Sequence, residues 1–537
     1  MTEVLAAQAE AHGEDPFLIT TDGDVLTYAA AQDQAARVGA FLRSVGIGRG
    51  DGLAVILPNS LDFVRVWLGA AHVGATFVPL NPALTGDFLA HQLRVSGASV
   101  AVVDADLLTN LEAVAGEIGQ PPTALVVGEP KNPTQLRVRR FSEWSGASPG
   151  QPAHTCARDT ACVMFTSGTT GPSKGVVMPH AHCYLLGLGS VDNLAVTSSD
   201  RYYIAMPLYH ANALFMQLYA TLIAGGSAVL RNRFSASEWL PDMRRHGCTV
   251  TNLLGAMSQF IIDQPDQPTD REHRVRVVLP APNPAHHEDA WRTRFGIAEV
   301  VSAYGMTEAN IPLYGRLGES RPGTAGFAYS RYFEVEIHDP DSDEPVAPGV
   351  PGEICVRSKV PYGFSGGYLG MPAETVTAVR NFWFHTGDLG VMDEHGCVTF
   401  VDRHKDCIRR RGENISSFEV EQAMAKHPQV KEVAAFPVPS TPVGTEDEVM
   451  LAVVPHGPDL TETDLAAYAD SILPRFARPR YIELVTDLPK TPTERVRKAV
   501  LRERGITAAT WDRDNPVRST EPAQRLEPTP ANSEVSA

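Results

Sequence analysis

The sequence reads CVMFTSGTTGPSKGVVMP from residue 162 to residue 179, and this stretch says most about the fold. An apolar, strand-like run ends at Phe165, hydroxyl residues and glycines follow, and a second β-branched run comes after Lys174. Glycines let backbone N–H groups approach phosphate oxygens, hydroxyls add donors, and one lysine neutralises charge. The order Gly-x-x-x-x-Gly-Lys-Ser/Thr is absent, so we predict a phosphate-binding loop unlike that of P-loop NTPases. Its residues are Thr166, Ser167, Gly168, Thr169, Thr170, Gly171 and Lys174.

Upstream of this loop, helix-like and strand-like patterns alternate along the chain. Helical apolar spacing covers residues 27–45 and 60–71, and apolar strand-like runs cover 53–57, 75–80, 100–103 and 123–127. This βαβ rhythm predicts an α/β fold with parallel sheets covered by helices.

Downstream of the loop the rhythm changes twice. Short strand patterns at 334–338, 352–358 and 396–401 are separated by Gly, Pro and Asp, which predicts a small β-barrel or antiparallel sheet. Further on, helix, strand, strand and helix patterns at 417–426, 430–437, 448–454 and 462–473 predict a separate α+β unit. We therefore predict a large domain over 1–401, a small mobile domain over 402–506, and a disordered tail rich in Pro, Glu, Ser and Thr over 507–537.

Composition narrows the classes of function. The formal net charge of −17 argues against a nucleic-acid partner held by bulk electrostatics. The seven cysteines are scattered and form no C-x-x-C pair, so the sequence suggests neither a zinc site nor a disulfide framework. The N-terminus has no signal pattern, and no apolar run reaches the roughly 18 residues needed to span a bilayer. We expect a cytoplasmic protein with no membrane partner, and we allow for a homodimer.

Three later motifs follow in a fixed order. They are SAYGMTE at 302–308, HTGDL at 385–389 and DRHKD at 402–406. Together with the loop at 162–179 they resemble the superfamily of acyl-CoA synthetases, peptide-synthetase adenylation domains and firefly luciferase. The resemblance runs from about Asp24 to Gly505 and is nearest to the crotonobetaine/carnitine-CoA ligase-like branch.

The resemblance implies the roles of several residues at a nucleotide site. Tyr304 would stack on adenine and Thr307 would contact the α-phosphate. Glu308 would hold Mg²⁺, as a hard carboxylate should. Asp388 would accept hydrogen bonds from the ribose hydroxyls. Further nucleotide contacts implied in the same way are Ala281, Ala303, Gly305, Met306, Phe400 and Arg403.

The resemblance also implies an acid pocket, a hinge and a second substrate. His210 would border the acid near its carboxylate, and the other pocket candidates are Asn212, Ala256, Ala281, Ala303, Met306 and Asn310. Asn212 and Asn310 favour a small polar or aromatic acid over a long apolar chain. Lys405 would be the hinge about which the small domain rotates. In CoA ligases the segment after it forms part of the pantetheine tunnel, so CoA is the expected co-substrate.

The chain departs from the family pattern at its end. The family reads P-K-T-x-x-G-K-x-x-R, where the second lysine bridges the carboxylate and the α-phosphate. Here Glu494 replaces the glycine and Arg495 takes the lysine position. Arginine keeps the charge but has a bulkier, planar fork. The catalytic cation could be Arg495, or the neighbouring Lys490 or Lys498.

The resemblance implies an ATP- and Mg²⁺-dependent ligase that converts a small carboxylate to its AMP anhydride, releases pyrophosphate and transfers the acyl group to CoA. Two alternatives remain open at this point. One is a CoA-independent enzyme of secondary metabolism that activates nitrite for attack by an aromatic amine. The other is a nucleotide-binding protein without turnover. The expected catalytic residues are Lys174, His210, Thr307, Glu308 and Arg495.

Overall fold

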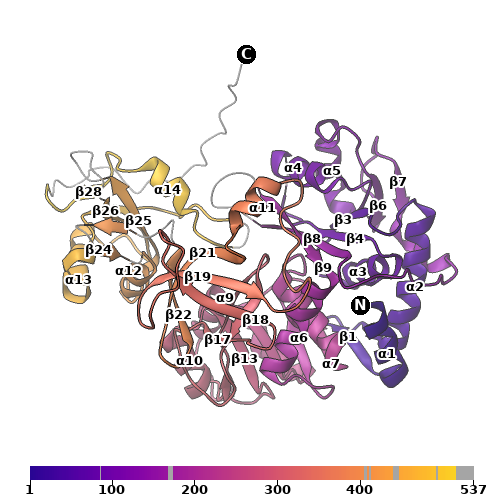
Figure 1. The fold of residues 1–537 in the computed structure, drawn as a ribbon, viewed down its shortest axis with the longest axis horizontal. Coiled ribbons are helices and arrows are strands. Elements are labelled where there is room, and N and C mark those ends of the chain that lie inside the picture. The colour runs from indigo at the N-terminus through magenta and orange to yellow at the C-terminus, as the bar shows by residue number, and fades with distance from the viewer. Residues whose placement is uncertain are drawn as a thin grey trace.

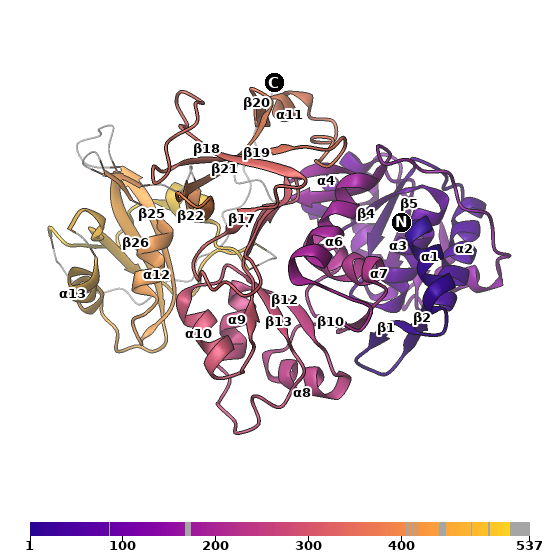
Figure 2. The same ribbon diagram turned by 60° about the horizontal axis from the view of Figure 1, so that its bottom comes forward.

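A computed structural model describes residues 1–84, 86–166, 173–403, 408–410, 413–415, 417–439, 447–473, 475–491 and 494–515. The N-terminal part contains two parallel-type sheets with helices packed on them, followed by an antiparallel sheet, and the C-terminal part forms a smaller lobe beside that sheet (Figures 1 and 2). This arrangement confirms the predicted α/β class with a smaller C-terminal domain.

One seven-stranded sheet has the order β7-β6-β5-β3-β4-β8-β9 and is parallel except for β9, which pairs antiparallel with β8. Its strands are β3 (Gly52–Ile56), β4 (Thr76–Pro79), β5 (Val100–Asp104), β6 (Thr123–Val127), β7 (Val138–Arg140), β8 (Thr160–Thr166) and β9 (Lys174–Pro179). The helices in this part of the chain are α2 (Tyr28–Ser44), α3 (Leu61–Val73), α4 (Gly86–Ser96) and α5 (Leu108–Ala113). The strand and helix patterns predicted before residue 130 therefore correspond to real elements.

Local signals set the ends of α3. The Ser60 hydroxyl accepts a hydrogen bond from the Phe63 N–H at the first turn, which satisfies a donor that the helix itself leaves unpaired. At the other end Gly74 adopts a φ of 73°, a left-handed conformation that glycine enters without steric cost. The chain can then turn directly into β4.

A second seven-stranded sheet has the order β14-β13-β12-β10-β11-β1-β2 and is parallel except for β2. Its strands are β1 (Pro16–Thr20), β2 (Val25–Thr27), β10 (Arg201–Ile204), β11 (Ser227–Leu230), β12 (Val250–Leu254), β13 (Val277–Ala281) and β14 (Glu299–Val300). Helices associated with it are α1 (Thr2–His12), α6 (His180–Leu194), the π-helix η4 (Asn212–Tyr219), α7 (Ala220–Ala224), α8 (Ala236–His246), α9 (Gly255–Ile262) and α10 (Ala285–Thr293).

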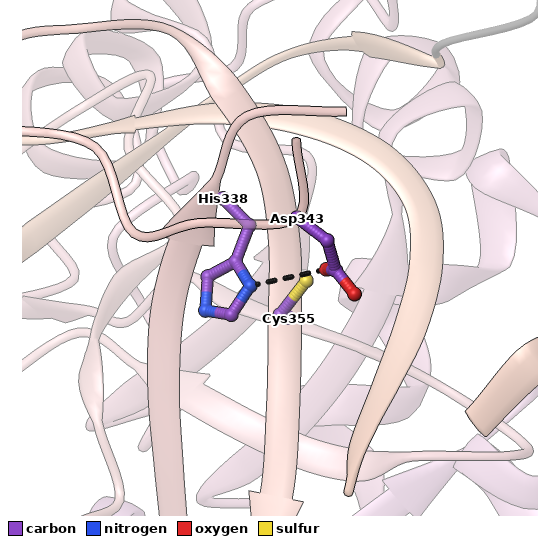
Figure 3. A group of neighbouring side chains, drawn as sticks. All are labelled: His338, Asp343 and Cys355. Atoms are coloured by element: carbon purple, nitrogen blue, oxygen red, sulfur yellow. Dashed lines mark hydrogen bonds and ion pairs between the residues drawn. The ribbon is translucent and has the colours of Figure 1, made fainter. Parts of the chain in front are cut away.

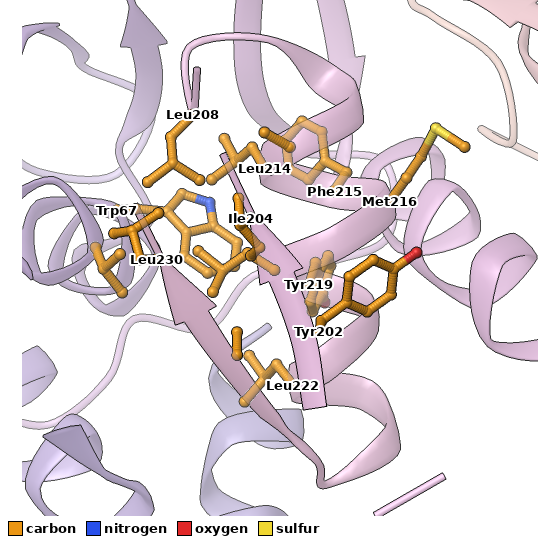
Figure 4. Packing of buried hydrophobic residues seen from close by; sticks show 14 of the residues in the cluster. Trp67, Tyr202, Ile204, Leu208, Leu214, Phe215, Met216, Tyr219, Leu222 and Leu230 are labelled. Carbon is orange, nitrogen blue, oxygen red and sulfur yellow. The ribbon is translucent and has the colours of Figure 1, made fainter. Parts of the chain in front are cut away.

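Both sheets contribute to one continuous apolar core. Figure 4 shows part of it, where α3 meets η4 and the strands β10 and β11. Trp67 of α3 packs edge-on against Tyr219 of η4, with ring centroids 5.7 Å apart at 82°. Edge-to-face contacts of this kind add to the free energy gained by burying large rings. The core therefore fixes η4, and with it the segment that carries His210.

The antiparallel sheet has the order β15-β16-β17-β22-β21-β19-β18, with β20 on β21. Its strands are β15 (Ala303–Met306), β16 (Asn310–Tyr314), β17 (Gly326–Ala328), β18 (Phe333–His338), β19 (Gly352–Ser358), β20 (Val379–Arg380), β21 (Trp383–Met392) and β22 (Cys397–Arg403), and α11 (Pro372–Ala378) precedes β20. It starts at 303 rather than 334, because the YGMT segment pairs with β16 as a hairpin. Within the described chain β15 and β18 are not paired, so the antiparallel sheet is observed and the closed barrel is not.

The C-terminal lobe is built on a four-stranded sheet of order β25-β26-β27-β28. Its elements are the β23 (Ile408–Arg410) and β24 (Glu413–Ile415) pair, α12 (Ser417–Met424), β25 (Val430–Pro439), β26 (Asp447–Pro455), α13 (Glu462–Ile472), β27 (Tyr481–Leu484), α14 (Lys498–Arg504) and β28 (Trp511–Asp512). Its own apolar clusters form separately from the large core.

Two predicted boundaries need correction. Residues 402 and 403 still belong to β22, where they pair with Leu389 and Asp388, so the break at 401 falls inside a strand. The prediction of a tail from residue 507 is wrong for 507–515, because Trp511 pairs with Ile482 of β27 and is only 7% exposed. The low apolar content of this segment predicted disorder, but a single tryptophan is enough to anchor it, because Trp511 pairs with β27. Residues 516–537 lie outside the described part of the chain.

Candidate active site

Several predicted site residues come from the same edge of the second parallel sheet. His210 follows β10, Ala256 lies in α9 directly after β12, and Ala281 ends β13. The carboxyl ends of parallel strands meet at one edge, where open α/β sheets bind their ligands. β15, which carries Ala303 and Met306, contacts β13 at this edge. The topology thus brings predicted pocket residues from distant parts of the chain to one edge.

The predicted phosphate residues converge on Glu308. Thr166 at the end of β8 and Tyr368 both donate hydroxyl hydrogen bonds to Glu308 Oε1, at 3.3 and 3.2 Å. Lys174 Nζ lies 4.8 Å from the centroid of the Tyr368 ring, within the range of a cation–π contact. A lysine, a carboxylate and two hydroxyls therefore meet next to the predicted phosphate loop.

Burial controls the charge of Glu308. The residue is 8% exposed, and desolvation raises the pKa of its carboxyl, although the two hydroxyl hydrogen bonds and the Lys174 charge act in the opposite direction. A buried carboxylate of this kind is stabilised when a cation binds to it. Glu308 therefore fits the role of a ligand for a hard divalent metal.

The predicted nucleoside residues also lie together. The Tyr304 hydroxyl donates to Asp388 Oδ2 at 2.8 Å, and the Tyr304 and Phe400 ring centroids are 6.2 Å apart. Gly305 lies so close to β16 that a Cβ there would stand 2.2 Å from the Asn310 carbonyl oxygen. The hairpin needs glycine at this position.

The turn that carries Asp388 is tightly held. Gly387 has a φ of 71° and donates its N–H to Glu353 Oε1 at 2.8 Å. The Thr386 hydroxyl donates to the Ile354 carbonyl oxygen at 2.7 Å and accepts from the Asp388 N–H. These contacts place a nearly buried aspartate beside two aromatic rings, an arrangement suited to a nucleoside.

His210 is half-buried, and its Nε2, itself buried, has no hydrogen-bond partner among the described residues. Burial, with a smaller contribution from the nearby Arg495 guanidinium, lowers the pKa of His210 to about 4. His210 is therefore neutral near pH 7. Arg495 belongs to the small domain, so this electrostatic contribution crosses between the two parts of the chain.

The two lysines considered as alternatives to Arg495 form ion pairs with glutamates of the small domain. Lys490 pairs with Glu432 at 2.8 Å and Glu494 at 3.3 Å, and Lys498 pairs with Glu421 at 3.0 Å. All of these partners belong to the small domain. Arg495 is the candidate cation that acts on a residue of the large domain.

The two predicted pocket asparagines, Asn212 and Asn310, have different surroundings. Its Oδ1 accepts hydrogen bonds from Gln217 and Asn252, both at 3.0 Å, which leaves Nδ2 as the donor side of the amide. Asn310 is 1% exposed with a φ of 66°, donates to the His182 carbonyl oxygen and accepts from the Ile311 N–H. Asn310 is therefore a turn residue of the β15–β16 hairpin, and its expected place in the pocket is not supported.

Some predicted residues lie outside what the structure describes. They are Ser167, Gly168, Thr169, Thr170 and Gly171 of the loop, the hinge residue Lys405, and the side chains of Ala256 and Arg403. The Arg403 backbone pairs with Asp388 in the β21–β22 register.

Sequence reasoning missed two residues of the site. Tyr368 contacts both Glu308 and Lys174, and its only sequence signal is an aromatic ring among glycines in GGYLG at 366–370. His182 is fully buried, and its Nε2 lies 3.0 Å from the carbonyl oxygen of Thr307. It holds the turn between Met306 and Asn310, and nothing local in the sequence marks it.

Comparison with known proteins agrees with this geometry. Residues 5–369 match the family model described as AMP-binding enzyme, and residues 419–495 match that of the AMP-binding enzyme C-terminal domain. Fold, site and domain order define the class of AMP-forming ligases. A crotonobetaine/carnitine–CoA ligase of Salmonella choleraesuis (strain SC-B67) is 31% identical over 488 residues, 89% of this chain and 93% of that protein. The chain belongs to the AMP-binding enzyme family.

Solved structures give the same result. ATP-bound MatB from Rhodopseudomonas palustris superposes with a TM-score of 0.83 at 28% identity, covering 94% of this chain and 98% of that one. The o-succinylbenzoate coenzyme A synthetase MenE from Bacillus subtilis, in complex with AMP, has a TM-score of 0.79 at 25% identity, covering 93% and 97%. These relatives confirm the predicted resemblance and do not favour the nitrite-activating or non-catalytic alternatives. Among the described residues no helix is long and apolar enough to cross a membrane.

Proposed function

We propose that this chain adenylates a small polar or aromatic carboxylate with ATP and Mg²⁺, and then transfers the acyl group to CoA. The observation that carries the proposal is the meeting of Thr166, Lys174 and Glu308 at one site. The CoA-ligase names of the relatives support the choice of acceptor.

The first half-reaction is an in-line attack. A carboxylate oxygen of the acid bonds to the α-phosphorus of ATP, and the bond from that phosphorus to the bridging oxygen breaks, releasing pyrophosphate. Lys174 and Arg495 offset the charge that develops, because fixed cations in a dry site need no reorganisation during the reaction. Mg²⁺ on Glu308 would neutralise phosphate charge when bound.

His210 suits the neighbourhood of the acid. A neutral imidazole does not repel the Arg495 guanidinium, and its unpartnered Nε2 offers the acid a hydrogen-bonding group. The donor side of the Asn212 amide adds a second polar group to the pocket. These two residues support a polar or aromatic acid as substrate.

In the second half-reaction the thiol of CoA bonds to the acyl carbon, AMP leaves, and the thiol proton is released. The small domain would rotate about Lys405 between the two steps and exclude water from the activated acid. The large domain, 1–401 with the strand continuing to 403, would keep both nucleotide and acid in place.

Three alanine variants test the assignment of the cation. We expect Arg495→Ala to slow pyrophosphate release by about 10²–10³, as for other single electrostatic contacts removed from an active site. Arg495→Lys should retain most of the rate because the charge remains. Lys490→Ala and Lys498→Ala are the matched controls, because both cations pair within the small domain.

The assay is pyrophosphate release on a panel of small acids, with and without CoA. Strong loss in Lys498→Ala with normal turnover in Arg495→Ala would mean that the cation is misassigned. Pyrophosphate release followed by no thioester with any acid would contradict CoA as the acceptor.

A further inference from the structure

Tyr368 contacts both charged groups of the candidate phosphate site. Its ring faces Lys174, whose Nζ is 4.8 Å from the ring centroid, and its hydroxyl donates to Glu308 Oε1 at 3.2 Å. The Thr166 hydroxyl donates to the same oxygen at 3.3 Å. One tyrosine therefore meets a cation through its π face and a carboxylate through its hydroxyl.

Lys174 and Glu308 do not form an ion pair with each other. Among the described residues the Glu308 carboxylate has hydroxyl partners and no cationic one, although burial raises its pKa and the Lys174 charge is close enough to act in the opposite direction. Most other buried carboxylates of the described chain pair directly with an arginine or a histidine. They are Asp200, Asp242, Asp270, Glu288, Glu353, Glu448 and Glu483. The half-buried Asp343 likewise lies 3.3 Å from His338 Nδ1 on the antiparallel sheet (Figure 3).

Direct pairing is the expected outcome for a lysine so near a buried carboxylate. Opposite charges attract more strongly in a site of low dielectric constant than in water, and a buried carboxylate without a cation is costly. The separation therefore needs a cause, and the ring of Tyr368 supplies one, because it offers the ammonium group a π face. The hydrogen bond from the hydroxyl to Glu308 polarises the ring and strengthens that contact.

The backbone on both sides of Tyr368 fixes its position. The Leu369 N–H donates to the carbonyl oxygen of Gly175 at 2.7 Å, in the strand that carries the lysine. The Ser365 N–H donates to the carbonyl oxygen of Glu308 at 3.2 Å. The segment therefore connects the strand of the cation with the turn of the carboxylate, and its tyrosine reaches both side chains.

We propose that Tyr368 is a positioning residue that keeps Lys174 and Glu308 apart until the nucleotide binds. The ring holds the ammonium group, and the hydroxyls of Tyr368 and Thr166 bind the carboxylate in place of a cation. Each charge then remains available for its own partner, Lys174 for the phosphates and Glu308 for Mg²⁺. The inference rests on the proposed function, because that reaction gives the two charges these partners.

Loss of the ring would let the two charges neutralise each other. Lys174 paired with Glu308 would have to leave that pair before it could bind a phosphate, so ATP should bind more weakly, even without Mg²⁺. Removal of the carboxylate should then restore the affinity, because the lysine loses its competing partner. Damage to the fold would not be repaired by this second substitution.

Calorimetric titration of the full-length protein with ATP in the presence of EDTA tests the proposal without metal or turnover. We expect Tyr368→Leu to raise the Kd for ATP about tenfold, and Glu308→Gln to lower it about tenfold more in the Tyr368→Leu background than in the wild type. Tyr368→Phe keeps the ring and should keep the Kd within about threefold of the wild-type value. Tyr362→Leu, at an exposed tyrosine shortly before Tyr368, is the matched control and should bind ATP as the wild type does.

Equal effects of Glu308→Gln in both backgrounds would show that no new ion pair forms, and would overturn the proposal. Wild-type affinity in Tyr368→Leu would overturn it as well. A loss in Tyr368→Phe as large as that expected for Tyr368→Leu would exclude the ring as the cause, and this variant decides the question if Tyr368→Leu does not fold. Wild-type protein that binds no ATP would contradict the proposed function together with this inference, whereas the other outcomes leave the proposed function intact.

Discussion

At the scale of single residues, the charge of Glu308 links stability to activity. Desolvation raises its pKa, so the folded protein holds this proton more tightly than the unfolded chain does. The free energy of unfolding should therefore fall as pH rises from the ordinary glutamate range through the raised pKa. The carboxylate that the reaction needs destabilises the nucleotide-free fold.

Glu308→Gln tests this link. The neutral amide should flatten the dependence of the melting temperature on pH above the ordinary glutamate range, and should not lower stability at neutral pH. Pyrophosphate release should fall by about 10²–10³. Thermal melts and the release assay measure the two effects, with Glu432→Gln in the small domain as control. Near-normal turnover in Glu308→Gln would remove this carboxylate from the site.

At the scale of structural elements, the turn before Arg495 is strained. Glu494 has a φ of 60°, and its N–H donates to the Thr491 carbonyl oxygen within the turn. The family has glycine at this position, which agrees with the left-handed conformation. A Cβ there costs about 1–2 kcal/mol, more than the roughly 0.5–1 kcal/mol of extra backbone entropy that glycine loses on folding.

We therefore expect Glu494→Gly to raise the free energy of unfolding of the small domain by about 0.5–1 kcal/mol. Chemical denaturation followed by circular dichroism measures the change. Glu494→Ala is the matched control, since it removes the same charge but keeps the Cβ. An equal gain in both variants would attribute the effect to the charge instead of the backbone.

The edge strand β28 gives a second prediction at this scale. Trp511 is 7% exposed and belongs to the apolar cluster of the small domain. Trp511→Ala should lower the free energy of unfolding of this domain by about 3–5 kcal/mol. Deletion of 516–537, a polar segment outside the described residues, is the control and should leave the denaturation curve unchanged. Equal curves for Trp511→Ala and wild type would mean that β28 adds no stability.

At the scale of the whole molecule, we expect the orientation of the small domain to decide which half-reaction the protein performs. Arg495 contributes to the lowered pKa of His210 across the domain boundary, and we expect this orientation of the small domain to be the one that supports attack on ATP. The CoA step would require the small domain to turn away. The same rotation would remove Arg495 from the acid.

Lys405→Pro should separate the two steps, because proline fixes φ at the proposed hinge. We expect pyrophosphate release to persist while thioester formation falls. Arg495→Ala provides the opposite pattern, with slow adenylation and normal thioester formation from a pre-made acyl-adenylate. Unchanged thioester formation in Lys405→Pro would refute the hinge, and equal loss of both steps would indicate misfolding.

Local patterns in the sequence were sufficient to predict the class of protein and most of its helices and strands, and to locate the main motifs. Periodicity located α2, α3 and β3 to β6 within a few residues, because burial of one face dictates the spacing of apolar side chains. The motifs predicted Glu308, Tyr304 and Asp388 as site residues, since backbone approach to phosphate and ribose requires particular residue types in a fixed local order. They could not exclude Asn310, whose local context resembles that of a pocket residue.

Contacts between distant segments were decided by the tertiary structure alone. Tyr368 meets Glu308 across 60 residues of sequence, and His182 meets Thr307 across 125. Lys490 and Lys498 pair within the small domain, whereas the electrostatic effect of Arg495 reaches His210 of the large domain. The pairing of three strands makes His338, Cys355 and His385 neighbours, and no C-x-x-C spacing in the sequence predicts this. Strand register and domain docking depend on the packing of the whole chain, and no local pattern encodes them.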